Sequence, residues 1–221
     1  MDLCIFSDRA SCERALGAQL ETRVASAIAE RSFAFAALAG GATPIALYQR
    51  IGTRIDSLRL RICPTDERWG PIESQNRNGL MLSKIFKQAQ LISSPFSGEM
   101  EPDAASWFDA LEANLPFDIC LLGMGEDGHI ASIFPHMDNA ELALDLSASP
   151  AILTAQAPVE PRLRLTPNLA MLLKTRWLGL LIYGEAKREL IERAALGQCP
   201  ELPIQALLAQ KHHIVHVYWA P

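Results

Sequence analysis

Short apolar segments alternate with helix-like segments along the whole chain of 221 residues, and no repeat or low-complexity linker interrupts them. The clearest strand is 117–123, FDICLLG, whose apolar residues occupy both faces, as in the centre of a parallel sheet. The clearest helix is 8–31, in which apolar residues recur every four positions. This alternation predicts one α/β domain over 1–221, with a mostly parallel sheet and helices on both of its faces.

The same criteria predict the other elements. Strands are expected at 3–6, 32–39, 58–64, 151–158, 162–165, 176–184 and 213–220. Helices are expected at 42–51, 79–88, 104–115, 166–174 and 185–196. Two of these helices begin at a Thr-Pro pair, which predicts Thr43 as the N-cap of one, and Thr166 with Pro167 as the start of the other. The segment 136–150 has no clear pattern and is a candidate lid by its position alone.

Three unusual loops follow predicted strands, at 39–43, 64–70 and 123–130. In a parallel α/β sheet the carboxyl ends of the strands share one edge, and ligands bind beyond that edge. We therefore expect the three loops to converge on one site.

Composition argues against several classes of protein. Hydrophobic residues make up 49% of the chain and charged residues 20%, as in ordinary globular domains. A net charge of −5 argues against a nucleic-acid-binding protein, which is usually basic. The amino-terminal segment lacks a signal-peptide pattern, and no apolar stretch reaches the ~20 residues that span a bilayer. Five irregularly spaced cysteines indicate free thiols, so we expect a cytoplasmic protein that does not contact membranes.

Metal binding is not expected. The chain contains neither a CxxC nor an HExxH motif. At the final predicted strand, if its extended backbone continues back to His212, His212 and His216 would lie ~13 Å apart at ~3.3 Å per residue, and His213 would face away from both. We interpret these histidines as a polar strand edge.

The segment AGGATP, 39–44, has the composition of an anion-binding loop. Gly40 and Gly41 follow a strand, so backbone N–H groups can approach an anion closely, and a helix begins just after them. A tight turn without a ligand would have the same sequence. The segment matches neither a Walker A loop nor a GxGxxG motif.

The segment TDERW, 65–69, places Asp66, Glu67 and Arg68 at the end of another strand. Arg68 could make a forked contact with a phosphate or carboxyl-like oxygen. A solvated run of charges, or a local salt bridge, is the structural alternative.

The segment GMGEDGHIAS, 123–132, is the strongest functional signal. A histidine side chain accepts protons near neutral pH, so His129 could act as a general base. Asp127 could select the tautomer of that histidine or position a water molecule. A histidine that only caps the next turn is the alternative, but three glycines around His129 at a strand end favour a functional role.

Lys187 lies in the first turn of the helix that follows the last glycine-ended strand, YGEAK. Its ammonium group could reach over the strand ends toward a phosphate. Taken alone, an exposed helix lysine explains the position equally well.

Together, and in this order, these motifs resemble the 6-phosphogluconolactonase family. The matching segments are 38–51, 63–82, 117–135, 161–166 and 181–194. The resemblance implies the α/β fold shared with glucosamine-6-phosphate deaminases and ribose-5-phosphate isomerases. It implies hydrolysis of 6-phosphoglucono-δ-lactone, a small sugar-phosphate substrate, in the oxidative pentose phosphate pathway. It implies no metal or organic cofactor, and we expect a monomer or small homo-oligomer.

The resemblance also implies roles for individual residues. His129 corresponds to the base, and Asp127 and Arg68 complete the catalytic group. The implied substrate- and phosphate-binding residues are Gly40, Gly41, Thr43, Asp66, Arg68, Gly125, Arg162 and Lys187. Arg68 could bind the phosphate or stabilise an oxyanion, and the sequence leaves both roles open. The chain departs from the family at Arg164, where a small hydroxyl residue is common.

Two alternatives from other classes remain. A sugar-phosphate deaminase-isomerase would share the fold and a similar histidine turn, but there the histidine is followed by a stretch containing a glutamate. This chain reads IASIFP at 130–135, without an acid. A non-catalytic regulator that binds sugar phosphates is the second alternative, because fold alone does not determine function.

Overall fold

The computed structural model describes all residues, 1–221, and its centre is a seven-stranded sheet in which every neighbouring pair of strands is parallel. The strand order is β1-β10-β9-β6-β2-β3-β5. The bounds are β1 Asp2–Ile5, β2 Ala34–Leu38, β3 Leu60–Pro64, β5 Gln90–Leu91, β6 Ile119–Leu122, β9 Leu178–Tyr183 and β10 Val215–Ala220. The apolar strand predicted within 117–123 is β6, which is fully buried in the middle of the sheet.

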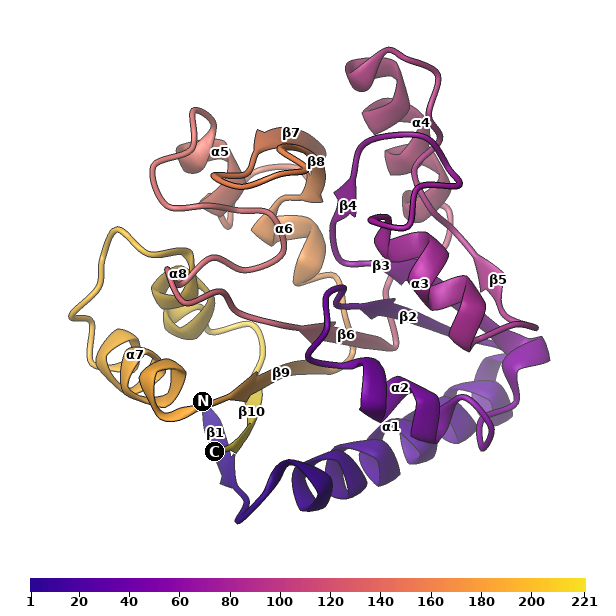
Figure 1. Cartoon of the computed structure of the whole chain (residues 1–221), viewed down its shortest axis with the longest axis horizontal. Helices are drawn as coiled ribbons and strands as arrows, with labels where there is room; N and C mark the ends of the chain where they lie inside the picture. The colour runs from indigo at the N-terminus through magenta and orange to yellow at the C-terminus, as the bar shows by residue number, and fades with distance from the viewer.

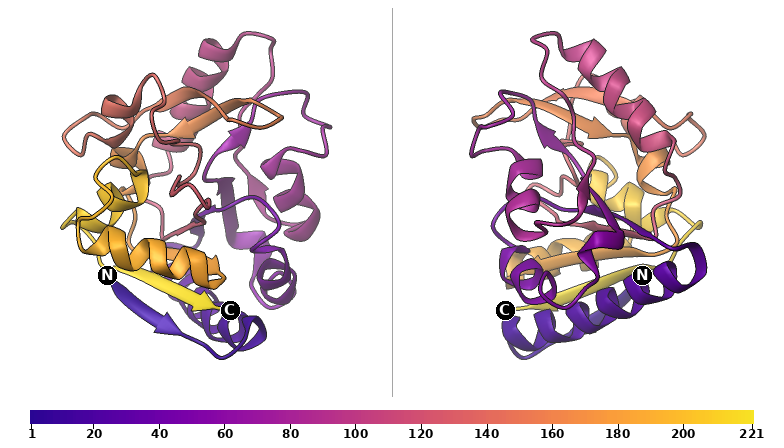
Figure 2. Two further views of the ribbon diagram at one scale, coloured as in Figure 1. Left: turned by 60° about the vertical axis from the view of Figure 1, so that its left-hand side comes forward. Right: turned by 90° about the vertical axis from the view of Figure 1, so that its right-hand side faces the viewer.

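Helices cover both faces of this sheet, as predicted. One face packs against α1 Arg9–Arg31, α2 Ile45–Ile51 and α3 Asn78–Ile85, and a short 3₁₀ turn spans Ser57–Arg59. The other face packs against α4 Met100–Glu112, α5 Ala140–Leu144, α6 Leu169–Leu172, α7 Glu185–Ala195 and α8 Pro203–Ala209. Figure 1 shows α1 and α2 below the sheet. The first strand, β1, pairs with the last, β10, and because the two strands run parallel the chain termini lie at opposite ends of this pair (Figure 2).

A second, smaller sheet was not predicted. It contains β4 Glu67–Arg68, β8 Leu163–Pro167 and β7 Ile152–Gln156, which pair antiparallel in the order β4-β8-β7. Figure 1 shows this sheet on the side opposite α1 and α2. It brings a two-residue strand from the loop after β3 beside a strand almost a hundred residues later, so it forms one wall above the carboxyl ends of the parallel strands.

Both predicted helix starts were wrong. Pro44 rather than Thr43 occupies the N-cap of α2, and no side chain caps that helix. Thr166 and Pro167 belong to β8, and Asn168 caps α6 by accepting a hydrogen bond from the N–H of Met171. The pairing of β8 with β7 continues through Pro167, so the sheet overrides the local signal for a helix start.

The helices α5 and α8 lie in segments for which no helix was predicted. Both are short, at five and seven residues, and their ends carry few local signals. No helix in the structure is both long and apolar enough to cross a bilayer.

Candidate active site

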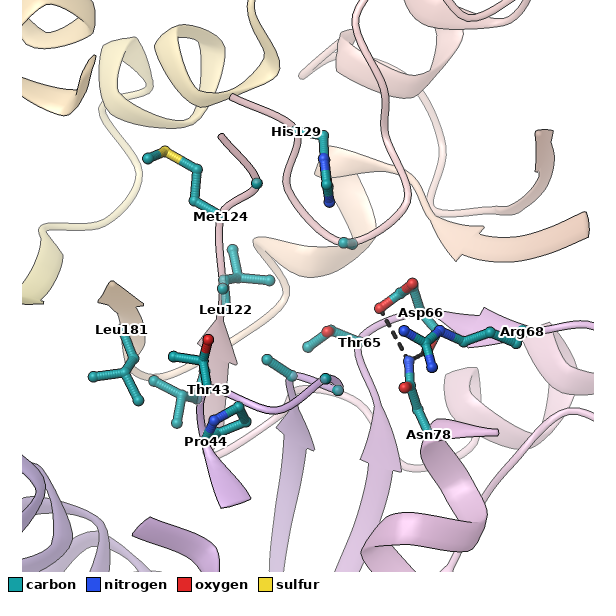
Figure 3. A pocket seen from close by; sticks show the side chains of 17 residues that line it. Thr43, Pro44, Thr65, Asp66, Arg68, Asn78, Leu122, Met124, His129 and Leu181 are labelled. Atoms are coloured by element: carbon teal, nitrogen blue, oxygen red, sulfur yellow. Dashed lines mark hydrogen bonds between the residues drawn. The ribbon is translucent and has the colours of Figure 1, made fainter. Parts of the chain in front are cut away.

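The loops that follow β2, β3 and β6 converge on one pocket, as the sequence predicted (Figure 3). The β2 loop contributes Ala39, Gly40, Gly41, Thr43 and Pro44. The β3 loop and the start of α3 contribute Thr65, Asp66, Arg68 and Asn78. The end of β6 and the following turn contribute residues 121–125, His129 and Ala131, and β9 contributes Leu181. The ionisable side chains of this lining are therefore Asp66, Arg68 and His129.

The loop after β2, which lines the pocket, carries unused hydrogen-bond donors. The backbone N–H groups of residues 40–43 donate no hydrogen bond within the protein. A side chain at Gly40 would overlap the amide of Asn78, and Gly41 adopts a φ of +80°, so both positions favour glycine. Consecutive free N–H groups in a glycine turn form a site that suits an anion such as a phosphate.

Asp66 connects the β3 loop to the histidine turn. Its Oδ2 accepts a hydrogen bond from the hydroxyl of Ser132 at 2.5 Å, and its backbone carbonyl accepts one from the side-chain amide of Asn78 at 2.7 Å. Ser132 also donates its backbone N–H to the hydroxyl of Thr166 on β8 at 3.3 Å. These bonds join the two sides of the pocket, and neither Ser132 nor Asn78 was predicted as a site residue.

His129 points into the pocket opposite Asp66 and Arg68 (Figure 3). Its Nδ1 lies 2.5 Å from Oδ1 of Asp127, which also accepts the backbone N–H of His129. A carboxylate on Nδ1 favours the tautomer with its proton there, which leaves Nε2 free to accept a proton. A side chain at Gly125 would overlap the His129 ring, so Gly125 permits this arrangement rather than contributing a functional group.

Arg68 lines the pocket with part of its guanidinium unused. Its Nη1 donates to the carbonyl of Asn76 at 2.6 Å, but its Nε is buried without a partner. The neighbouring Glu67 points the other way and is fully buried. Burial raises the pKa of Glu67, and the charge of Arg77 and three backbone N–H donors offset this only in part. Arg68 is thus held by its backbone N–H and by Nη1, while its Nη2 makes no hydrogen bond in the structure.

Lys187 lies behind the pocket wall. Its Nζ donates to the carbonyl of Met124 at 2.6 Å, and Met124 lines the pocket. Burial lowers the pKa of Lys187, while the charges of Glu126 and Asp127 oppose that shift. In this structure Lys187 therefore supports the turn that carries His129, and its side chain is not part of the lining.

Arg162 is not brought to the pocket. Its side chain is 62% exposed and pairs with Glu160, with 3.3 Å between Nε and Oε1. The buried arginine of this strand is Arg164, two residues later, which is only 6% exposed. The alternating arginines of RLRL gave no signal for this difference, because alternation marks a strand face but not what covers it.

Comparison with known proteins identifies the family of this chain. The family described as glucosamine-6-phosphate isomerases/6-phosphogluconolactonase matches residues 7–219. The 6-phosphogluconolactonase of Rhizobium meliloti is 33% identical over 98% of this chain and 97% of its own length. A 6-phosphogluconolactonase crystal structure from Shewanella baltica is 27% identical and has a TM-score of 0.90, covering 100% of this chain and 98% of that one. A monomeric glucosamine-6-phosphate deaminase shares the fold, with 17% identity and a TM-score of 0.81, covering 100% of this chain and 97% of that one. The chain belongs to the glucosamine-6-phosphate isomerase/6-phosphogluconolactonase family.

Proposed function

We propose that this protein hydrolyses 6-phospho-D-glucono-1,5-lactone to 6-phospho-D-gluconate, the second step of the oxidative pentose phosphate pathway. The observation that carries the proposal is that His129, paired with Asp127, shares one pocket with the 40–43 loop, whose N–H groups are free. One side offers a base and the other an anion site, as hydrolysis of a phosphorylated lactone requires. The relatives named 6-phosphogluconolactonase support the same reaction.

The reaction needs no covalent nucleophile, because a lactone is an activated ester. Nε2 of His129 takes a proton from a water molecule as that water attacks the C1 carbonyl. The tetrahedral intermediate then collapses, the bond between C1 and the ring oxygen breaks, and His129 returns the proton to that oxygen. Asp127 stabilises the positive charge that His129 carries between these steps.

The phosphate fixes the other end of the substrate. In this proposal the N–H groups of residues 40–43 bind it, so that binding energy far from C1 holds the reacting carbon beside His129. Arg68 lies between the two ends on the wall of the pocket. The proposal places the enzyme in the cytoplasm, as a monomer or small homo-oligomer.

The deaminase alternative differs at the histidine turn. The lining contributed by residues 121–131 contains no carboxylate, so no second acid accompanies His129 inside the pocket. The available carboxylate, Asp66, is already bound to Ser132 and lies on the opposite wall. This arrangement favours hydrolysis by a single base.

The test is lactone hydrolysis measured on substrate generated in situ by glucose-6-phosphate dehydrogenase and compared with the spontaneous rate. The wild type should accelerate hydrolysis, and His129→Ala should lose about 10²–10⁴-fold in kcat while melting at the same temperature. The matched control is His212→Ala, which removes an exposed histidine from the segment just before β10. This variant should retain full activity. Release of ammonia from glucosamine 6-phosphate, without lactone hydrolysis, would overturn the proposal in favour of a deaminase.

A second substrate tests the anion site. Unphosphorylated glucono-δ-lactone should be a poor substrate, because it cannot use the N–H groups of residues 40–43. Equal kcat/KM on the two lactones would contradict the assignment of that loop.

A further inference from the structure

Arg164 is a buried cation without a partner. It is 6% exposed, its Nε has no hydrogen-bond acceptor, and its guanidinium forms no ion pair in the structure. Burial, and then the positive charge of Arg68, lower the pKa of Arg164, while Asp66 and Glu67 oppose them. Arginine nevertheless stays protonated in proteins, so the cost of this buried charge cannot be relieved by loss of a proton. It can be relieved by an anion.

The register of the small sheet places Arg164 beside Arg68. The two residues are direct cross-strand partners in the β4–β8 pair, so their side chains project from the same face, with Cβ atoms about 5 Å apart. Like charges directly opposite each other destabilise a sheet. Both guanidinium groups also have a buried Nε without an acceptor. The pair is therefore an unfavourable arrangement in the free protein.

This face of β8 is directed toward the histidine turn. Thr166 lies two residues after Arg164, so the two side chains share a face. The hydroxyl of Thr166 accepts the N–H of Ser132, and the hydroxyl of Ser132 binds Asp66 on the pocket wall. The opposite face of β8 carries Leu165, which is buried in the hydrophobic core. Arg164 thus projects from the face of β8 that adjoins the pocket wall formed by Asp66 and Arg68.

The nearby carboxylates do not neutralise the pair. Glu67 is already bound by three backbone N–H groups and lies 3.6 Å from Arg77. Asp66 accepts from Ser132 and makes no ion pair with either Arg68 or Arg164. The two guanidinium charges of Arg68 and Arg164 therefore have one nearby carboxylate left, that of Asp66, which already accepts a hydrogen bond from Ser132.

We propose that Arg164 supplies the second positive charge of an oxyanion site, acting beside Arg68 on the negative charge that forms at the C1 oxygen. The inference rests on the proposed hydrolysis. Arg68 lines the pocket and contacts the oxygen, whereas Arg164 lies behind it and is a positioning and electrostatic residue. The phosphate is not the ligand of this pair, because residues 40–43 already provide its donors. The uncharged lactone gains charge at C1 only as water attacks, so the pair stabilises the transition state and the carboxylate product.

Kinetics on two lactones test this role. Arg164→Met keeps the unbranched stem of the side chain as far as the position of Nε but removes the charged guanidinium group. It should lower kcat by about 10- to 100-fold on both the phosphorylated and the unphosphorylated lactone. KM should change by less than about threefold, because the ground state carries no charge at C1. Arg164→Lys, which restores the charge, should recover most of the loss. A loss confined to the phosphorylated lactone would overturn the proposal in favour of a phosphate contact, and equal losses in Met and Lys variants would show a purely structural role.

Binding of a matched pair of ligands tests the same role without turnover. 6-Phosphogluconate and glucitol 6-phosphate differ only at C1, where one has a carboxylate and the other a hydroxyl group. The wild type should prefer the carboxylate in calorimetric titrations, and Arg164→Met should reduce that preference by about tenfold. An unchanged preference, or no preference in the wild type, would overturn the inference. If the wild type does not hydrolyse the lactone, the proposed function fails, but this binding ratio still decides the role of Arg164.

The control variant is Arg50→Met. Arg50 also has a buried Nε without a partner, but it lies on α2 with its side chain beside Gly17 of α1, away from the pocket. Arg50→Met changes the net charge of the protein by the same amount as Arg164→Met, and it should leave both the kinetics and the ligand preference unchanged. If Arg164→Met does not fold, Arg164→Gln gives the same comparison with hydrogen-bond donors but no charge.

Discussion

Two buried arginines lie on either side of β4, and their surroundings differ completely. Arg77, just before α3, is 2% exposed and has a full set of partners. Its guanidinium donates to the carbonyls of Gly70 at 2.7 Å and Ser94 at 2.5 Å, and to the hydroxyl of Ser94 at 2.8 Å. The carboxylate of Glu67 lies 3.6 Å from its Nε. Arg164, on β8, is almost as buried but has no such partner and faces Arg68 instead.

The difference separates stability from function. A buried charge with every donor satisfied holds the fold together, because removing it leaves its partners unpaired. A buried charge without partners lowers stability and is retained where a ligand supplies the missing partner. The Arg77 region therefore anchors the β4 loop, whereas the Arg164 region is the one that we propose acts on negative charge formed in the reaction.

The largest loss of stability is expected when Arg77 is replaced. Arg77→Met should lower the free energy of unfolding by about 3–5 kcal/mol, because it leaves the Glu67 carboxylate buried without its cation. Urea denaturation monitored by tryptophan fluorescence measures this change. A loss below about 1 kcal/mol would show that the two arginine regions do not differ in the proposed way.

A pocket residue should show the opposite behaviour. Asp127→Ala should lower kcat by about 10- to 100-fold, because His129 loses the group that orients it and stabilises its charge. Its melting temperature should stay close to that of the wild type, because the side chain of Asp127 is 43% exposed. A large loss of stability with unchanged kcat would place Asp127 with the structural residues.

The stability of Arg164→Met, measured without ligand, gives the direct counterpart to Arg77→Met. In the absence of ligand its free energy of unfolding should equal that of the wild type or exceed it by up to about 2 kcal/mol, because the variant removes an unpaired buried charge. The same urea experiment as for Arg77→Met measures this. Destabilisation comparable to that of Arg77→Met would show that Arg164 has structural partners in solution.

The smallest effect concerns acid stability in the Arg77 region. Asp103 on α4 accepts the indole N–H of Trp69 at 2.7 Å and the N–H of Ser97 at 2.9 Å. Burial acts to raise the pKa of Asp103, but these hydrogen bonds and the charge of Arg77 outweigh it and leave the pKa below its usual value. A lowered folded-state pKa contributes stability above the unfolded pKa of about 3.9, and that stability is lost as the pH falls through the folded pKa.

Asp103→Asn should therefore cost about 1 kcal/mol of stability at neutral pH, the scale of one hydrogen bond. The difference from the wild type should shrink below about pH 4, where the wild-type carboxyl also becomes neutral. Urea denaturation at several pH values checks this. A difference that is independent of pH would contradict the assigned shift.

Local patterns were sufficient for much of the fold. The uninterrupted apolar sequence of β6 and the four-residue periodicity of α1 are properties of adjacent residues. The alternating α/β organisation could therefore be predicted without any tertiary contact. The convergence of three loops followed from the rule that parallel strands end at one edge. Gly40 and His129 line the pocket and Asp127 is bonded to His129, and each stands in a local motif at such an end that the sequence alone singled out.

Non-local pairing explains the errors. The signal for a helix start at Thr166 and Pro167 was real, but β7 pairs with these residues and extends them into a strand. Arg162 lies outside the pocket lining because it precedes the first residue of β8 and its side chain is exposed to solvent, so its role stays a prediction. Neither outcome can be calculated from adjacent residues, because the partner strand lies elsewhere in the sequence.

The amino-acid sequence by itself determined the class of fold, the pocket edge and the histidine turn, because hydrophobic periodicity and glycine motifs act over a few residues. Only the tertiary structure decided which of the two arginines in RLRL is buried, and which residue it faces. That decision depends on the register Arg68↔Arg164 between strands far apart in the chain. A one-residue shift in register would turn Arg164 away from the pocket, since successive strand side chains point to opposite faces.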